Sequence, residues 1–184
     1  MTYYGAKELA ASFRTVRNNT IVVAQEIPEE KYNFQAAPET RTAAQMLTHI
    51  AIVPRMARQI HGVEQRTTLE GFDFPGFMSK MIAEEQAVRS KSAIVELLKT
   101  EGDSLAQWME GLTESFLAER VAFPQGMTPP SKTRFEMLLG LKEHEMHHRG
   151  QLMLIERILG VVPHLTRQMQ ERIAAMQAAA KANA

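Results

Sequence analysis

Residues 133–160, with the sequence TRFEMLLGLKEHEMHHRGQLMLIERILG, predict one long helix that carries three of the six histidines of the chain. Thr133 and Glu136 form a capping box, in which a hydroxyl and a carboxylate three residues later satisfy free backbone amides at a helix start. Gly160, with Pro163 just beyond it, marks the end of the helix. The inward stripe of this helix consists of Met137, Leu141, His144, His148, Ile155 and Ile158.

His144 and His148 lie four residues apart, so a helix places both imidazoles on one face. Two buried imidazoles are costly unless a shared metal ion or a polar network satisfies their ring nitrogens. Imidazole is the commonest protein ligand for zinc and similar ions, and a helical pair leaves a third ligand to come from elsewhere. His147 shares its face with small and polar residues, so we interpret it as peripheral to the site.

His49 is the candidate for the third ligand, on a second amphipathic helix that begins with a capping box at Thr42 and Gln45. Pro54 predicts a bend about one turn beyond His49. The apolar stripe that contains His49 also contains Met46, Val53, Met56 and Ile60. Taken alone, a histidine on such a stripe is more often a hydrogen-bonded core residue than a ligand, and that alternative stays open.

Four segments carry the helical period of apolar residues and are predicted as the principal helices: residues 7–25, 42–60, 91–112 and 133–160. We expect a short helix over 78–88 and a last amphipathic helix over 166–180, which would cover the bundle or a partner chain. Glycines and prolines predict irregular connections over 62–75 and 113–130. His61 and His164 lie beside turns and are expected to be exposed. The prediction is an all-α four-helix bundle with additional short helices, as one domain over residues 1–184.

Composition argues against several function classes. The chain has no cysteine, so any metal must be held by nitrogen and oxygen, and no disulfide or cysteine nucleophile can form. Lysine plus arginine equals aspartate plus glutamate at 21 each, which disfavours nucleic acid as a partner. No stretch of about 18 apolar residues occurs, and residues 1–8 do not have the pattern of a secretion leader. We therefore expect a cytoplasmic protein that does not span a membrane.

Three histidines without an obvious fourth protein ligand are typical of a catalytic site, because structural zinc is closed by four side chains. The open position would bind water or an oxygen or sulfur atom of a substrate. Glu145 follows His144 and is our candidate for a general base, or for an acceptor of a ligand N–H. The alternative for Glu145 is an ordinary solvated glutamate, and Arg149 and Gln151 have the same ambiguity.

Two motifs connect the chain to a known family. Residues 38–42, PETRT, precede 47–51, LTHIA, and residues 144–152, HEMHHRGQL, lead to Leu159 and Gly160. With these motifs the chain resembles the DinB family of DinB/YfiT-like four-helix bundles over most of its length. That family extends into bacterial thiol-dependent transferases and a mycothiol-dependent maleylpyruvate isomerase.

The resemblance implies a divalent-metal site made by His49, His144 and His148, holding zinc or nickel, in a protein that forms homodimers. The leading hypothesis is a metal-dependent thiol-dependent S-transferase or hydrolase, acting on a small-molecule substrate such as a low-molecular-weight thiol. We expect a single domain, without the second domain by which multidomain members would identify their substrate. The alternatives are a non-catalytic metal-binding protein of the stress or damage response, and a dry hydrogen-bonded network of histidines.

Overall fold

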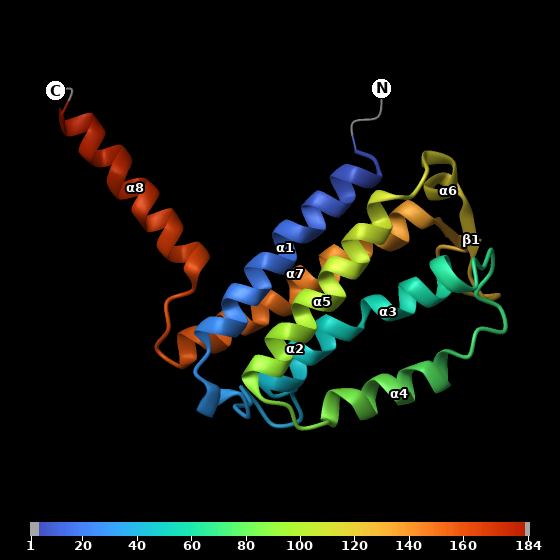
Figure 1. The fold of residues 1–184 in the computed structure, drawn as a ribbon, viewed down its shortest axis with the longest axis horizontal. Helices are drawn as coiled ribbons and strands as arrows, with labels where there is room; N and C mark the ends of the chain where they lie inside the picture. The colour runs from blue at the N-terminus through green and yellow to red at the C-terminus, as the bar shows by residue number, and fades with distance from the viewer. Residues whose placement is uncertain (1–3, 183–184) are drawn as a thin grey trace.

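The computed structural model describes residues 4–182, which form a helical bundle with one small hairpin. The four long bundle elements are α1 (Ala6–Glu26), α2 (Ala43–Ile52), α5 (Lys91–Glu110) and α7 (Arg134–Ile158). Helix α1 packs along α5 and α7, and α2 packs against the same two helices (Figure 1). The prediction of an all-α four-helix bundle is confirmed, and each long helix begins within a few residues of its expected start.

Apolar side chains from all four helices fill the bundle in two clusters. One cluster lies toward the end of α1 and includes Val23, Leu47, Ile50, Leu98 and Leu152. The other lies toward the start of α1 and includes Leu9, Phe13, Leu105, Met109 and Leu138. Complete burial of one such side chain stabilises the fold by about 1.5–3 kcal/mol. The two clusters therefore provide a rigid support for polar groups placed between and beside them.

Pro54 interrupts the second bundle helix at the place where the sequence predicts a bend. Helix α2 ends at Ile52, a short α3 (Pro54–Ala57) follows, and the chain continues as a π-helical turn, η2 (Arg58–Val63). Proline has no N–H to donate to the preceding turn, so the regular ladder of hydrogen bonds cannot pass through it. The break falls one turn beyond His49, which leaves the histidine on the regular part of the helix.

Smaller elements connect the long helices. A 3-10 turn, η1 (Glu29–Lys31), follows α1, and α4 (Phe74–Gln86) packs beside α2. Helix α4 begins four residues before the expected start at 78, because Asp73 caps it by accepting from the backbone N–H of Gly76. The connection expected to be irregular over 113–130 contains a short helix, α6 (Glu114–Ala118). It also contains β1 (Arg120–Ala122), which pairs antiparallel with β2 (Ser131–Thr133).

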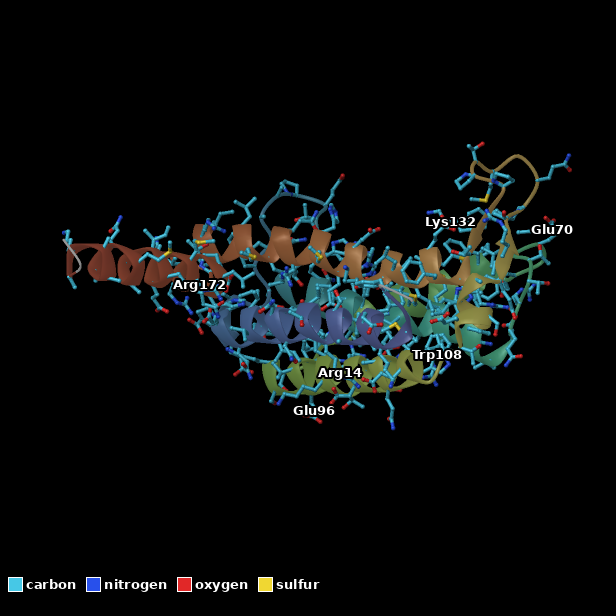
Figure 2. The ribbon with its side chains drawn as sticks, turned by 90° about the horizontal axis from the view of Figure 1, so that it is seen from above. Arg14, Glu70, Glu96, Trp108, Lys132 and Arg172 are labelled. Atoms are coloured by element: carbon cyan, nitrogen blue, oxygen red, sulfur yellow. The ribbon has the colours of Figure 1, made fainter. Side chains whose placement is uncertain are left out.

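The last helix, α8 (His164–Ala182), does not cover the bundle. It points away from the end of α7 in both overall views (Figures 1 and 2). Its exposed side chains include Met169, Ile173 and Met176, which lie on one stripe. Within residues 4–182, no helix is both long and apolar enough to cross a lipid bilayer.

Two histidines expected at the surface are buried, so that prediction was wrong. His61 is 1% exposed, and its Nδ1 accepts a hydrogen bond of 3.0 Å from Nη1 of Arg134. His164 is 5% exposed, and its Nε2 lies 3.2 Å from Oδ1 of Asn19. In both cases one ring nitrogen has a polar partner that is distant in sequence, which offsets part of the cost of burial, while Nδ1 of His164 is buried without a partner among the described residues.

Candidate metal centre

His49 on α2 meets His144 and His148 on α7. The Nε2 atom of His144 lies 3.2 Å from Nε2 of His49 and 3.1 Å from Nε2 of His148. All three ligand nitrogens lie within 4.8 Å of one another. The regular turn of α7 explains the approach of His144 and His148, and the packing of α2 against α7 brings in His49 from 95 positions away.

These separations match the size of a metal ion. Zinc lies about 2.0–2.1 Å from each imidazole nitrogen, so two nitrogens of a tetrahedral site are about 3.3 Å apart. Among residues 4–182, these three histidines are the only group of histidine, aspartate and glutamate side chains close enough together to hold an ion. The triad could therefore hold a metal ion.

Hydrogen bonds behind the triad set which nitrogen of His49 and of His148 faces the centre. Nδ1 of His49 donates to Oε1 of Glu85 over 2.5 Å, and Nδ1 of His148 donates to Oε1 of Gln151 over 2.8 Å. A ring that donates through Nδ1 presents a lone pair at Nε2 in its neutral form. Such support from a carboxylate or amide oxygen is typical of metal-binding histidines, because it fixes the ring orientation and the tautomer.

This pattern leaves more lone pairs than protons at the centre. The Nε2 atoms of His49 and His148 both face Nε2 of His144 as acceptors. His144 can donate only one hydrogen from Nε2, so at most one of the two neighbours is satisfied by a neutral triad. A cation placed among the three nitrogens satisfies all of them, and the donor set therefore fits a divalent ion better than a dry histidine network.

The surroundings of His144 and His148 favour the neutral form of both rings. Burial, followed by the positive charges that His148 and His49 would carry, lowers the pKa of His144 to about 4. Burial also lowers the pKa of His148, against the hydrogen bond to Gln151, which raises it. Burial raises the pKa of Glu85, but hydrogen bonds from His49 and Arg41 outweigh that effect and lower it overall. At neutral pH His144 and His148 are thus free to bind a metal, and Glu85 is ionised.

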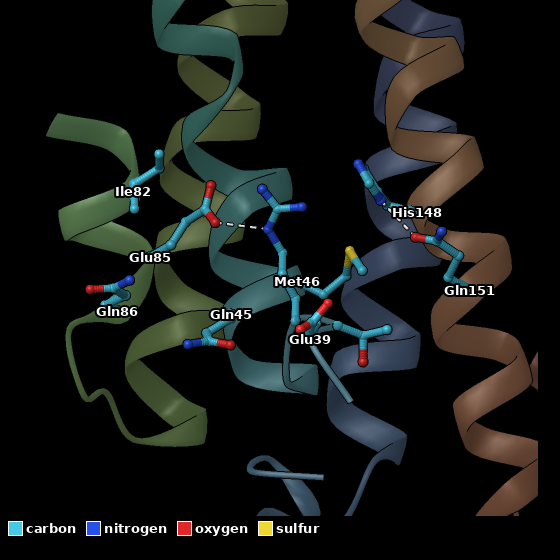
Figure 3. Close-up of a pocket in the computed structure, with 10 residues that line it drawn as sticks. Glu39, Gln45, Met46, Ile82, Glu85, Gln86, His148 and Gln151 are labelled. Atoms are coloured by element: carbon cyan, nitrogen blue, oxygen red, sulfur yellow. Dashed lines mark hydrogen bonds and ion pairs between the residues drawn. The ribbon is translucent and has the colours of Figure 1, made fainter. Parts of the chain in front are cut away.

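A cavity of about 510 Å³ opens beside the triad (Figure 3). His148 and Gln151 of α7 lie on one side, with Glu85 and Ile82 of α4 on the other and Met46 of α2 between them. Cavities of about 300–1,000 Å³ hold small molecules in proteins. A small molecule in this cavity would contact His148 directly.

A profile of the DinB superfamily matches residues 12–152, which is most of the chain and includes all three histidines. The chain belongs to the DinB superfamily. Two solved DinB-like proteins have the same fold, one (YjoA) from Bacillus subtilis and one from Bacillus cereus ATCC 10987. The comparison with curated proteins found no match.

The two solved structures agree with the fold over most of their length. The B. subtilis protein is 21% identical, with a TM-score of 0.61, and the alignment covers 83% of this chain and 92% of that protein. The B. cereus protein is 17% identical, with a TM-score of 0.66, and the alignment covers 88% of this chain and 97% of that protein. At these identities the likeness concerns the DinB fold alone.

Glu145, the sequence candidate for a general base, is directed into the core of this DinB bundle. It is 2% exposed, and its two oxygens accept three hydrogen bonds of 2.9–3.1 Å from Arg17 of α1. A carboxylate held in this way by a guanidinium is poorly available as a proton acceptor. The expectation of a general base is corrected here to a packing role, and the acidic residue beside the triad is Glu85.

Gln151, Arg149 and His147, whose roles the sequence left undecided, lie in different surroundings. Gln151 supports His148, whereas Arg149 is buried and donates from Nη1 to the backbone oxygen of Val16. His147 is exposed and lies 3.4 Å from Nε2 of Gln151, at the edge of the site as expected. Helix geometry explains the division, because residues at successive positions point about 100° apart.

Sequence reasoning missed Glu85 and Arg41. Glu85 stands beside Glu84 in a short amphipathic segment, and nothing in the spacing distinguishes the two carboxylates. Only the packing of α4 against α2 brings Glu85 to His49, while Glu84 pairs with Arg55 and Arg89. Arg41 lies inside the PETRT motif, which indicates its position but does not predict its contact with Glu85.

Proposed function

We propose that this DinB protein is a divalent-metal-dependent enzyme that acts on a small molecule, as a thiol-dependent S-transferase or a hydrolase. In this proposal His49, His144 and His148 hold zinc or nickel. The observation that carries it is the convergence of three Nε2 atoms next to a cavity, without a fourth histidine, aspartate or glutamate among residues 4–182. A three-ligand set leaves one coordination direction for water or substrate, as in catalytic zinc sites.

The bound ion would supply Lewis-acid chemistry, lowering the pKa of a bound water or thiol, or polarising an oxygen of the substrate. The residues of the chain supply binding and orientation. Glu85 and Gln151 hold the rings of His49 and His148 in place. Met46 and Ile82 offer apolar surface in the cavity, and Gln86 and Gln151 offer amide groups. This lining favours a small, partly polar substrate.

Metal reconstitution tests the proposal. The protein is stripped with a chelator, reloaded with zinc or nickel, and assayed against a panel of low-molecular-weight thiols with electrophiles, and against esters and amides. We expect turnover only in the reloaded protein, loss of turnover in His148→Ala, and retention in the matched control His147→Ala. If the fully loaded protein turns over no substrate in the panel, the proposal of a transferase or hydrolase is contradicted.

The second candidate is a non-catalytic metal-binding protein of the stress or damage response. The observation that favours it is that an ion at the triad would join α2 to α7, two helices far apart in sequence, and so stabilise the bundle. A ligand present at about 100 times its Kd stabilises a fold by about 2.7 kcal/mol. This candidate predicts that His148→Ala removes the rise in Tm caused by metal, while no activity is lost.

We also propose that the protein forms a homodimer, as the family resemblance implies. Helix α8 supports this, since most of the stability of a protein helix comes from packing of its apolar face, and α8 extends away from the bundle (Figure 1). Its exposed stripe of Met169, Ile173 and Met176 offers an apolar surface that a second copy could bury. Sedimentation should therefore show a dimer for the full chain and a monomer for the double variant Met169→Glu, Ile173→Glu. A monomeric full chain would contradict this proposal.

A further inference from the structure

One buried carboxylate holds both a histidine of the triad and an arginine. Oε1 of Glu85 accepts from Nδ1 of His49 over 2.5 Å, and Oε2 accepts from Nε of Arg41 over 2.8 Å. Glu85 is 6% exposed, so its hydrogen bonds to His49 and Arg41 are largely shielded from solvent. The guanidinium of Arg41 is therefore fixed at a set place relative to the triad, unlike an ordinary arginine at the surface.

Most of the hydrogen-bonding capacity of Arg41 is unused. A guanidinium has five N–H donors, and only Nε of Arg41 donates to another described residue. The four N–H groups on its two Nη atoms have no partner among residues 4–182 in the hydrogen bonds of the structure. The side chain is 35% exposed and lines the same cavity as His148. Figure 3 shows the ion pair of Glu85 on one side of this cavity and His148 on the other.

The charges around the cavity leave Arg41 available to a ligand. The negative charge of Glu85 is shared between Arg41 and His49, and the other acidic residue of the lining, Glu39, is exposed to solvent. With a divalent ion at the triad, the wall formed by Arg41 and the histidines is positively charged.

We infer that the cavity binds a small organic anion, whose carboxylate is recognised by the Nη groups of Arg41 while its other end faces the triad. This inference rests on the proposed metal-dependent function and deepens it by naming the substrate class. The planar guanidinium matches a carboxylate through two parallel N–H···O bonds, a geometry that lysine cannot reproduce. Met46 lies between the two walls of the cavity and Ile82 lies on the wall of Glu85, so the lining offers apolar surface to a short apolar chain (Figure 3).

A pair of probes of nearly equal size tests the inference. Succinate and succinamide differ in charge but hardly in shape, and calorimetric titration of the zinc-loaded protein measures the Kd of each. We expect succinate to bind about tenfold to a hundredfold more tightly than succinamide. Arg41→Gln should remove most of this preference, and Arg41→Lys should retain part of it. The matched control Arg66→Gln, which makes the same charge change at a different cavity, should leave the preference intact.

Metal analysis and circular dichroism of each variant establish that it is folded and loaded before the titration. The inference is overturned if succinate and succinamide bind equally, or if neither binds. It is also overturned if Arg41→Gln keeps the full preference, because the ion alone would then account for anion binding. Failure of the proposed catalysis is distinguishable from failure of this inference. In that case the protein turns over no thiol, ester or amide, but it still prefers succinate to succinamide and the preference still depends on Arg41.

Discussion

Arg17 and Glu145 form a buried ion pair between α1 and α7, although 128 residues separate them. Both side chains are 3% exposed. Arg17 also donates to the backbone oxygens of Leu98 and Ile50, so one guanidinium connects all four bundle helices. A buried charge is tolerated only when it is paired and hydrogen-bonded, and this arrangement satisfies both conditions.

Removing one partner of this pair should unfold the protein more easily without affecting the metal. We expect Glu145→Ala to lower the free energy of unfolding by about 3–5 kcal/mol, because Arg17 is left buried and unpaired. Urea denaturation measures the loss, and metal titration should give an unchanged stoichiometry. Glu143→Ala, an exposed site on the same helix, is the control and should change stability by less than about 0.5 kcal/mol. A stable Glu145→Ala protein that has lost activity would restore the general-base hypothesis.

Gly102 of α5 makes room for Arg17. A Cβ atom built at Gly102 would lie 2.7 Å from Cγ of Arg17, whereas one built at Gly140 of α7 would meet nothing within 4 Å. Alanine is favoured over glycine in a helix by about 1 kcal/mol, but displacing a packed side chain costs about 1–3 kcal/mol. We therefore expect Gly102→Ala to be destabilising and Gly140→Ala to be neutral or stabilising in the same denaturation assay. Equal effects at the two sites would mean that Arg17 moves aside freely.

Glu85 should control metal affinity through His49. Glu85→Gln keeps the size of the side chain and one oxygen acceptor but removes the charge that faces Nδ1 of His49. Loss of such a supporting carboxylate typically weakens metal binding about tenfold to a hundredfold. Competition with a chromophoric chelator measures the change, and Glu84→Gln is the adjacent control. Unchanged affinity in Glu85→Gln would show that α4 does not act on the triad.

Signals contained within a single helix were readable from the sequence. The capping boxes at Thr42 and Thr133 are formed as expected, and the second bundle helix is interrupted at Pro54, where a bend was expected. These features depend on side chains and backbone groups three or four positions apart. For the same reason His144 and His148 could be paired without any structure.

Features that depend on packing between helices were not readable. Glu145, Glu85 and His61 are all defined by partners at least 36 positions away. Helical period predicts which face of a helix is apolar, but it does not predict which polar residue of another helix will meet a given side chain. His49 became a candidate because it lies on the apolar stripe of a second helix, and the family motif then indicated the same residue.

The buried ring of His61 should make stability depend on pH. Burial, together with the charge of Arg134, lowers the pKa of His61 from its ordinary value of 6.5 to about 4 in the folded protein. Between these values the unfolded chain binds a proton that the folded protein does not bind. Stability therefore falls as pH decreases through this window and is recovered as pH rises above about 6.5.

The variant His61→Gln isolates this effect, because glutamine can still accept a hydrogen bond from Arg134 but does not titrate. From about pH 7.5 to about pH 5, the wild type should lose about 2 kcal/mol more of its free energy of unfolding than the variant does. Urea denaturation of both proteins measures the difference. Both are metal-free, so that the triad contributes equally to the stability of each. Parallel pH profiles would indicate that His61 takes up its proton without unfolding, through an opening near Trp108 where a small cavity reaches the ring.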